Sequence, residues 1–411
     1  MKKKKTKSQK KQKKPRIILN RRKLNMNTFK FVGKIRRIEE KGDRKYIDTA
    51  TFDSGWTIER AKFIVSYDGN DQFIDVSGGK FRDNSKNMVK TVFARTSEEG
   101  KDEPVDVAWE DRFNSEIIDK VAKYRLYTID LSSDQTREKL VSEGKVEDAQ
   151  ALAKQKYIYL TPYDFTIKIA ELLRTNGFGD KDYVITGSVE YSYSYSKKTQ
   201  SWGYYRSFVP TAIRLAGDDE KRGMFGRLDF YYLSDDFAGP KDTDGVQTVN
   251  GYLRFYERMS KKNYFVPAGL QLEPENASFI RVFDMNYFDD AEVLVVGVTV
   301  EFFRGTTKTP IKDVELSEKN QLLIKLGVRT KEDIIAELSG TAYGDTVERV
   351  YMKGLSRGYA EGPKETDSTA AELVEQPSGT RATLNNGKTA AEKKANREKA
   401  INLWDDEDDE I

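Results

Sequence analysis

Residues 189–208 alternate aromatic with small polar side chains on both sides of a polar turn, and no other stretch constrains the fold as strongly. Alternation with a period of two around a turn is typical of a β-hairpin. If residues 197–200 form the loop, Ser196 pairs with Ser201, and the register of the whole hairpin follows. The cross-strand pairs are then Tyr195 with Trp202, Tyr193 with Tyr204 and Tyr191 with Arg206.

These six side chains share one face of the expected hairpin, because successive side chains on a strand point to opposite faces. The face is either a core surface, which aromatic residues suit, or a solvent-facing platform on which the bases of single-stranded nucleic acid stack. Hydroxyl and guanidinium groups are costly to bury without partners, which favours exposure toward the turn. Apolar residues near the base favour burial there: Ile185, Val189 and Phe208.

Further rings and cations extend this candidate surface. Tyr252, Arg254, Tyr256 and Arg258 share one face of a strand expected over residues 246–257. For each of these, an ordinary core or rim position is the alternative reading. The residues expected to bind nucleic acid are Tyr191, Tyr193, Tyr195, Lys197, Lys198, Trp202, Tyr204, Arg206, Trp56, Tyr252 and Arg254.

The chain contains no cysteine and no histidine. Disulfides, thiolate or imidazole metal sites and Ser-His or Cys-His nucleophiles are therefore excluded, and we expect no catalytic residue, no metal and no cofactor. The longest apolar run, residues 293–300, is too short to cross a bilayer. We expect a non-enzymatic cytoplasmic protein (host cytoplasm, if a phage encodes it) with no membrane partner and no small-molecule substrate.

Charge is distributed very unevenly along the chain. Residues 1–23 carry thirteen Lys or Arg and no acid, whereas residues 405–410 are six consecutive acids. Removing both from the net charge of +3 leaves −4 between them, so an anion-binding surface there must be a local patch. The basic arm is read either as a solubilising or localisation tail, or as a non-specific phosphate-binding arm.

The pattern of strands and turns predicts a mainly β fold with helical insertions (α+β). Helices are expected over residues 116–124, 135–154 and 165–174, and a strand over residues 278–283. Two further helices are expected over 317–326 and 331–338. The expected organisation is a disordered basic arm (1–27), an OB-like β domain with a helical insertion (28–217), a second β-rich domain (218–340), a flexible linker (341–398) and an acidic docking tip (399–411).

The C-terminal residues are Leu403, Trp404, Asp405, Asp406, Glu407, Asp408, Asp409, Glu410 and Ile411. This segment resembles the partner-docking tip of phage and bacterial single-stranded DNA-binding proteins, although here the Trp precedes the acids and the last residue is Ile. Residues 27–35, with an apolar strand that bends at Gly33 before Lys34, are similar to the first strand of the OB-fold in those proteins. Residues 73–76, followed by Gly79 and Lys80, resemble a later barrel strand. The resemblance implies a five-stranded OB-fold barrel that binds oligonucleotides across one face.

The sequence therefore predicts a protein that binds single-stranded DNA without strong sequence specificity. Its acidic tip is expected to recruit replication or recombination proteins, as the resemblance to phage proteins implies. The alternative is a virion or assembly protein whose tails contact nucleic acid or other proteins.

Overall fold

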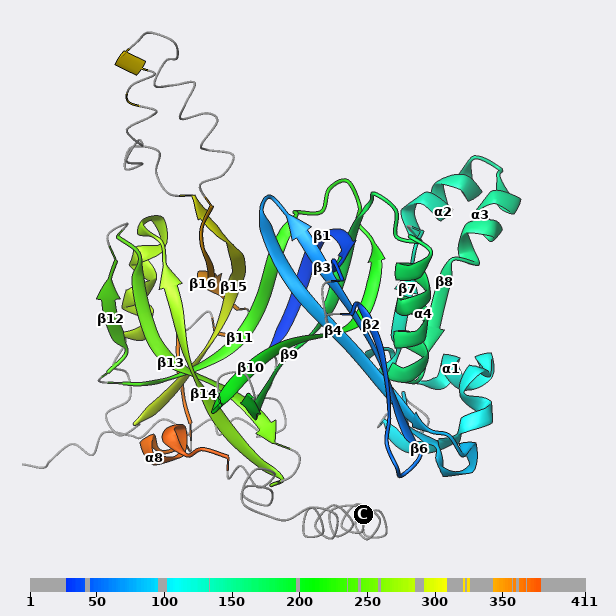
Figure 1. Ribbon diagram of the computed structural model, residues 1–411, viewed down its shortest axis with the longest axis horizontal. Helices are drawn as coiled ribbons and strands as arrows, with labels where there is room; N and C mark the ends of the chain where they lie inside the picture. The colour runs from blue at the N-terminus through cyan, green and yellow to red at the C-terminus, as the bar shows by residue number, and fades with distance from the viewer. Residues whose placement is uncertain are drawn as a thin grey trace, which may run out of the picture.

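The computed structural model describes residues 27–40, 45–94, 102–132, 134–196, 200–234, 236–242, 245–257, 260–284, 292–308, 343–356, 362–366 and 368–377, together with 321, 324, 325, 358 and 359. Fifteen strands form one continuous sheet that closes into two barrels side by side (Figure 1). The mainly β fold with an OB-fold-like barrel is thus confirmed.

The first barrel and its insertion contain β1 (Thr28–Arg37), β2 (Ile47–Thr51), β3 (Trp56–Tyr67), β4 (Asn70–Phe81), η2 (Asn84–Lys86), β5 (Met88–Phe93), β6 (Glu103–Ala108), η3 (Trp109–Phe113), α1 (Ser115–Lys120), η4 (Lys123–Arg125), β7 (Tyr127–Asp130), α2 (Asp134–Ser142), α3 (Val146–Ala153), β8 (Lys156–Tyr159), α4 (Pro162–Arg174), β9 (Asp182–Ser196) and β10 (Ser201–Leu215). The second barrel contains β11 (Gly223–Leu233), β12 (Ala238–Lys241), β13 (Gln247–Glu257), β14 (Lys262–Leu272), η5 (Pro274–Phe279), α5 (Ile280–Phe283), β15 (Val293–Lys308), β16 (Tyr343–Leu355), β17 (Lys364–Glu365) and α8 (Ala370–Val374).

The first barrel has the strand order of an OB-fold. Its first strand, β1, pairs with both β3 and β9, while β3 pairs with β4 and β9 with β10. The strands β4 and β10 lie side by side and bring the two edges together. The helix α4, between β4 and β9 in the chain, packs against β3 and β4. It begins at Pro162, three residues before the expected start, because the Thr161 hydroxyl accepts a hydrogen bond from the Asp164 amide and Pro162 occupies the first turn.

The second barrel repeats this order. Here β11 is the first strand and pairs with both β13 and β15, and β13 pairs with β14. The strands β14 and β16 pair in parallel, and β16 returns antiparallel to β15, so the second barrel closes through backbone ladders. Two short helical turns, η5 and α5, lie between β14 and β15 in the chain, the position that α4 has between β4 and β9 in the first barrel. The chain is therefore a tandem of two OB-like barrels.

The two barrels are joined through their first strands. Residues 28–32 of β1 pair antiparallel with residues 223–227 of β11, and β1 changes partner at Gly33 so that residues 34–37 pair with β3. This change of partner falls at Gly33, the residue at which a bend is expected. Four rings fill the junction behind this ladder: Phe29, Phe31, Phe208 and Phe302. All four are buried, and each contributes about 1.5–3 kcal/mol of apolar burial.

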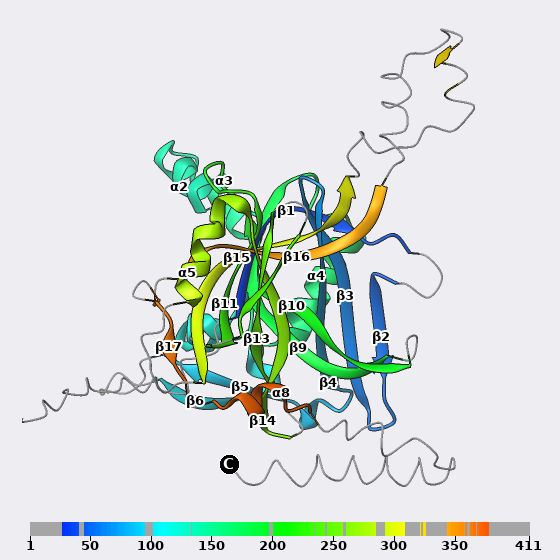
Figure 2. The same ribbon diagram turned by 90° about the vertical axis from the view of Figure 1, so that its left-hand side faces the viewer.

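This pairing sets the directions of the two long hairpins. Since β9 runs antiparallel to β1, and β15 runs antiparallel to β11, the β9–β10 and β15–β16 hairpins point in opposite directions. Figure 1 shows the first toward the bottom and the second toward the top. Figure 2 shows α8 beside an end of β14, against which it packs.

Several expectations from the sequence are wrong. The helix expected over residues 135–154 is two helices, α2 and α3, because Gly144 between them has a left-handed φ of +78°. Residues 278–283 belong to η5 and α5 instead of a strand. The linker expected over residues 341–398 contains β16, β17 and α8, so the second barrel extends beyond residue 340.

Other expectations fall outside the described residues. These are the basic arm up to residue 26 and all of the acidic tip. The helices expected over 317–326 and 331–338 lie in a stretch of which only residues 321, 324 and 325 are described.

Candidate nucleic-acid interface

The β9–β10 hairpin has the register that the sequence predicts. Ser196 pairs with Ser201, Tyr195 with Trp202, Tyr193 with Tyr204 and Tyr191 with Arg206. In the first barrel these two strands are the fourth and fifth, and OB-folds bind oligonucleotides with the strand 2–3 face and the loop between strands 4 and 5. The predicted contacts Lys197 and Lys198 lie outside the described residues.

Five rings lie on one face of the hairpin and are here named the ring ladder: Tyr191, Tyr193, Tyr195, Trp202 and Tyr204. Tyr193 stacks on Trp202 with ring centroids 5.2 Å apart and an angle of 21°. Tyr195 meets the edge of the same indole at 5.8 Å, and Tyr204 lies 4.8 Å from Tyr193. Ring–ring contacts therefore join four of the five rings.

Burial along the ring ladder falls from the base of the hairpin to its tip. Val189 and Phe208 at the base are buried, whereas Tyr195 near the tip is 42% exposed. Tyr191, Tyr193 and Tyr204 between them are half-buried and pack against the core. The ring face is therefore core surface at the base of the hairpin and solvent-exposed toward its tip.

The inner end of the ring ladder is the least hydrated part. Burial raises the pKa of Tyr191 to about 12, and the nearby Arg206 guanidinium opposes this rise only in part. Arg206 lies over the rings of Phe208 and Phe302, 5.2 Å from each centroid. Its Nη2 atom donates to Glu348 on β16 at 3.1 Å, so the predicted phosphate contact is already ion-paired.

The second barrel contributes a neighbouring strand, β13. Tyr252 and Arg254 are half-buried, and Tyr256 is 51% exposed. The Nε atom of Arg254 is buried and has no hydrogen-bond partner within the described part of the chain. It is Phe255, on the opposite face of this strand, that meets Tyr204 of the hairpin at 6.0 Å. Arg258 lies outside the described residues.

The structure does not bring Trp56 to the hairpin. This residue begins β3, and its ring packs edge-on against Phe81 of β4 at 4.8 Å. The indole also lies over Gly79, where an added Cβ would come within 2.4 Å of it. Trp56 is half-buried on the β3–β4 pair, the second and third strands of the first barrel.

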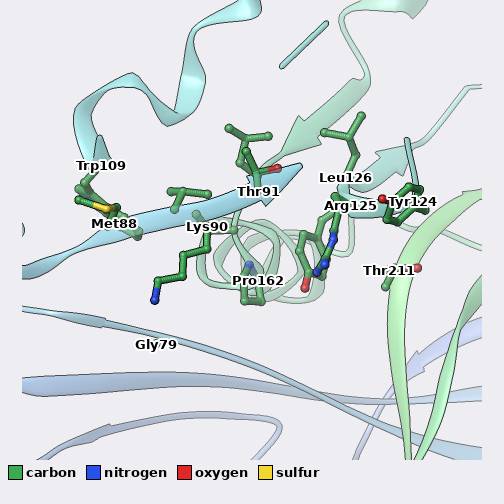
Figure 3. A pocket seen from close by; sticks show the side chains of 14 residues that line it. Gly79, Met88, Lys90, Thr91, Trp109, Tyr124, Arg125, Leu126, Pro162 and Thr211 are labelled. Carbon is green, nitrogen blue, oxygen red and sulfur yellow. The ribbon is translucent and has the colours of Figure 1, made fainter. Parts of the chain in front are cut away.

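A cavity of about 260 Å³ lies between β5, η4 and the start of α4 (Figure 3). Its lining contains two cations, Lys90 and Arg125, and no carboxylate. Trp109, Tyr124 and Tyr127 supply rings. The cavity includes none of the predicted site residues.

Within the described residues, no group of acidic side chains has the arrangement of a metal site, and no helix is long and apolar enough to cross a membrane.

Comparison with known proteins gives little guidance. No family model matches the chain, and no curated protein matches it. Among solved structures, the chain is similar to the wild-type single-stranded DNA binding protein of Thermus aquaticus, with 9% identity, a TM-score of 0.25 and coverage of 72% of this chain and 98% of that one. A deletion mutant of the same protein has the same identity and TM-score, with coverage of 67% and 87%. Likeness at this level carries no argument about this chain.

Sequence reasoning also missed several residues around the hairpin. Tyr205 is 40% exposed on the hairpin face opposite the ring ladder. From the C-terminal side, Gln376 accepts a hydrogen bond from the Tyr193 hydroxyl at 3.4 Å, and Glu375 lies 3.8 Å from Lys262. Only the alternation could have indicated Tyr205, while the other contacts depend on the folding of segments far apart in the chain.

Proposed function

We propose that this protein binds single-stranded DNA without strong sequence specificity. The observation that carries the proposal is the ring ladder, which rises from the core to solvent on the fourth and fifth strands of an OB-like barrel. Every base has a π face, so stacking tolerates any sequence, and each stacked base contributes about 1–3 kcal/mol.

Bases stack on Tyr195, Trp202 and Tyr193, where the rings reach solvent. Phosphates contact Arg206, Lys197 and Lys198, with Arg254 and Tyr252 on the neighbouring barrel extending the path. The protein binds its ligand and does not transform it.

In this proposal the acidic tip, residues 403–411, recruits replication or recombination enzymes and competes with DNA for the same basic groups. A phage-encoded protein of this kind would act in the host cytoplasm.

A pair of exposed tyrosines provides the test. Tyr195 lies on the ring ladder and Tyr205 on the opposite face, with nearly equal exposures of 42% and 40%. Binding is followed by tryptophan fluorescence while oligo(dT), duplex DNA or RNA is added at two salt concentrations.

We expect oligo(dT) to quench the fluorescence, with a log–log salt slope of about −0.7 per phosphate contacted. Tyr195→Ala should weaken binding by about 5- to 150-fold, the equivalent of one stacked base, while Tyr205→Ala should leave it unchanged. The proposal fails if oligo(dT) does not quench, if duplex binds equally well, or if both variants bind like the wild type.

A further inference from the structure

The two hairpins meet at a carboxylate that lies between two arginines. Glu348 on β16 accepts a hydrogen bond from Arg206 Nη2 at 3.1 Å and from Arg304 Nε at 2.8 Å, one on each carboxylate oxygen. Arg206 comes from the β9–β10 hairpin, whereas Arg304 is the cross-strand neighbour of Glu348 on β15. One negative charge thus faces two positive ones.

Both guanidinium groups are held by contacts that do not involve Glu348. Arg206 lies over Phe208 and Phe302, and Arg304 lies 4.2 Å from the centroid of Phe73. Their side chains are only 19% and 29% exposed. Stacked, partly buried guanidinium groups lose little further freedom when they bind an anion.

The backbone that carries Arg304 is also fixed. Its amide donates to Asn70 Oδ1 at 3.0 Å, and Asn70 Nδ2 donates to the Phe302 carbonyl at 2.7 Å. Asn70 and Gln72 are both buried, and Gln72 Nε2 donates to Asn70 Oδ1 at 2.8 Å. The arginine pair is therefore built into the junction between the barrels.

Glu348, in contrast, is easily displaced. Its side chain is 54% exposed, and an ion pair at such a position contributes little to stability. A phosphodiester carries the same single negative charge and also offers two oxygens to a pair of guanidinium groups. The Glu348 carboxylate therefore offers the two arginines the same charge and the same number of oxygen acceptors as a phosphodiester would.

We propose that Arg206 and Arg304 form a phosphate-binding subsite for the backbone of single-stranded nucleic acid, and that Glu348 competes with the phosphate for it. The subsite lies at the inner end of the ring ladder, since Arg206 is the cross-strand partner of Tyr191. This inference rests on the proposed function and adds to it a barrel-to-barrel contact that the sequence did not indicate.

The test is Glu348→Gln, which keeps the shape of the side chain and removes its charge. Glu301→Gln is the matched control, because Glu301 lies on the same hairpin, faces the other way and pairs with Lys353 at 3.4 Å. Thermal unfolding of each variant confirms that it folds, which we expect of a substitution at a half-exposed position.

Glu348→Gln should tighten oligo(dT) binding in low salt by about two- to fivefold, the range of a half-exposed ion pair. The log–log salt slope should become steeper by about 0.7. In the wild type the phosphate displaces the Glu348 carboxylate from the two arginines, whereas in Glu348→Gln it displaces a counterion. Glu301→Gln should change neither quantity. If both variants bind oligo(dT) like the wild type, the subsite is wrong while the proposed function stands.

A second measurement separates the two proposals. Inorganic pyrophosphate should raise the unfolding temperature of Glu348→Gln more than that of Glu301→Gln. If no form of the protein binds oligo(dT) but this difference is present, the anion subsite stands and the proposed function falls. Equal shifts for the two variants would overturn the subsite.

Discussion

Asn70 Nδ2 donates a hydrogen bond of 2.7 Å to the carbonyl of Phe302 and thereby fastens the start of β4 to β15 of the other barrel. The Oδ1 atom of the same side chain accepts from the Arg304 amide at 3.0 Å. One buried side-chain amide therefore satisfies backbone groups on both sides of Phe303.

Asn70→Ala should lower the free energy of unfolding by about 1–3 kcal/mol, because it leaves the Arg304 amide without its acceptor and leaves the buried Phe302 carbonyl with only the longer hydrogen bond of 3.4 Å from Gln72 Nε2. Urea denaturation measures the change. Asn84→Ala, at an exposed position in η2, should shift the midpoint very little. A loss no larger than that of Asn84→Ala would mean that the bridge contributes nothing.

Gly33 lies where β1 leaves β11 and joins β3. A Cβ at this position would come within 2.4 Å of the Ser66 carbonyl oxygen, so backbone must move to admit it. We expect Gly33→Ala to be destabilising and Gly354→Ala, where a Cβ meets nothing within 4 Å, to be nearly neutral. Denaturation midpoints of the two variants measure the difference. Equal midpoints would show that the contact between position 33 and the Ser66 carbonyl does not limit the side chain there.

The stability of the fold should fall in alkaline solution. Burial raises the pKa of Tyr191 to about 12 from a usual value of 10, and likewise raises the pKa values of Tyr159 and Tyr183 to about 12. A group whose pKa is raised in the folded state contributes stability that is complete below pH 10 and is lost as the pH rises toward 12. Tyr191→Phe should make this decline shallower in urea titrations between pH 9 and 12. A decline as steep as that of the wild type would contradict the prediction.

The described part of the chain ends near the ring ladder. Leu373 of α8 is buried against the second barrel, and Gln376 accepts from the Tyr193 hydroxyl. The segment that bears six consecutive acids follows from there. Deleting residues 405–411 should therefore tighten oligo(dT) binding, most strongly at low salt, because a competing polyanion is removed. Unchanged or weaker binding would count against a competing tail.

Local patterns in the sequence were sufficient for the hairpin and for α4. Alternation and a four-residue loop determine the register from Ser196–Ser201 to Tyr191–Arg206, and the local pattern of residues 165–174 indicates α4, whose cap at Thr161 places its start at Pro162. Both depend on residues close together in the chain.

Longer-range features were not predictable in this way. Strand β16 was expected to be linker. It is a strand because Met352 and Val350 pair with residues of β15, which ends more than thirty residues earlier in the chain, and local composition does not indicate that pairing. The contact of Arg206 with Glu348 spans 142 residues and exists only because two barrels meet. No spacing rule connects such residues.

The exchange of strand edges between β1 and β11 also limits how the chain can be divided. Each barrel covers half of one edge of the other barrel's first strand. A cut between Leu215 and Gly223 would leave both halves with an open row of amides and carbonyls, the kind of edge along which separate chains associate. The two barrels are thus one cooperative unit, and fragments made at this apparent boundary should aggregate or reassemble with each other.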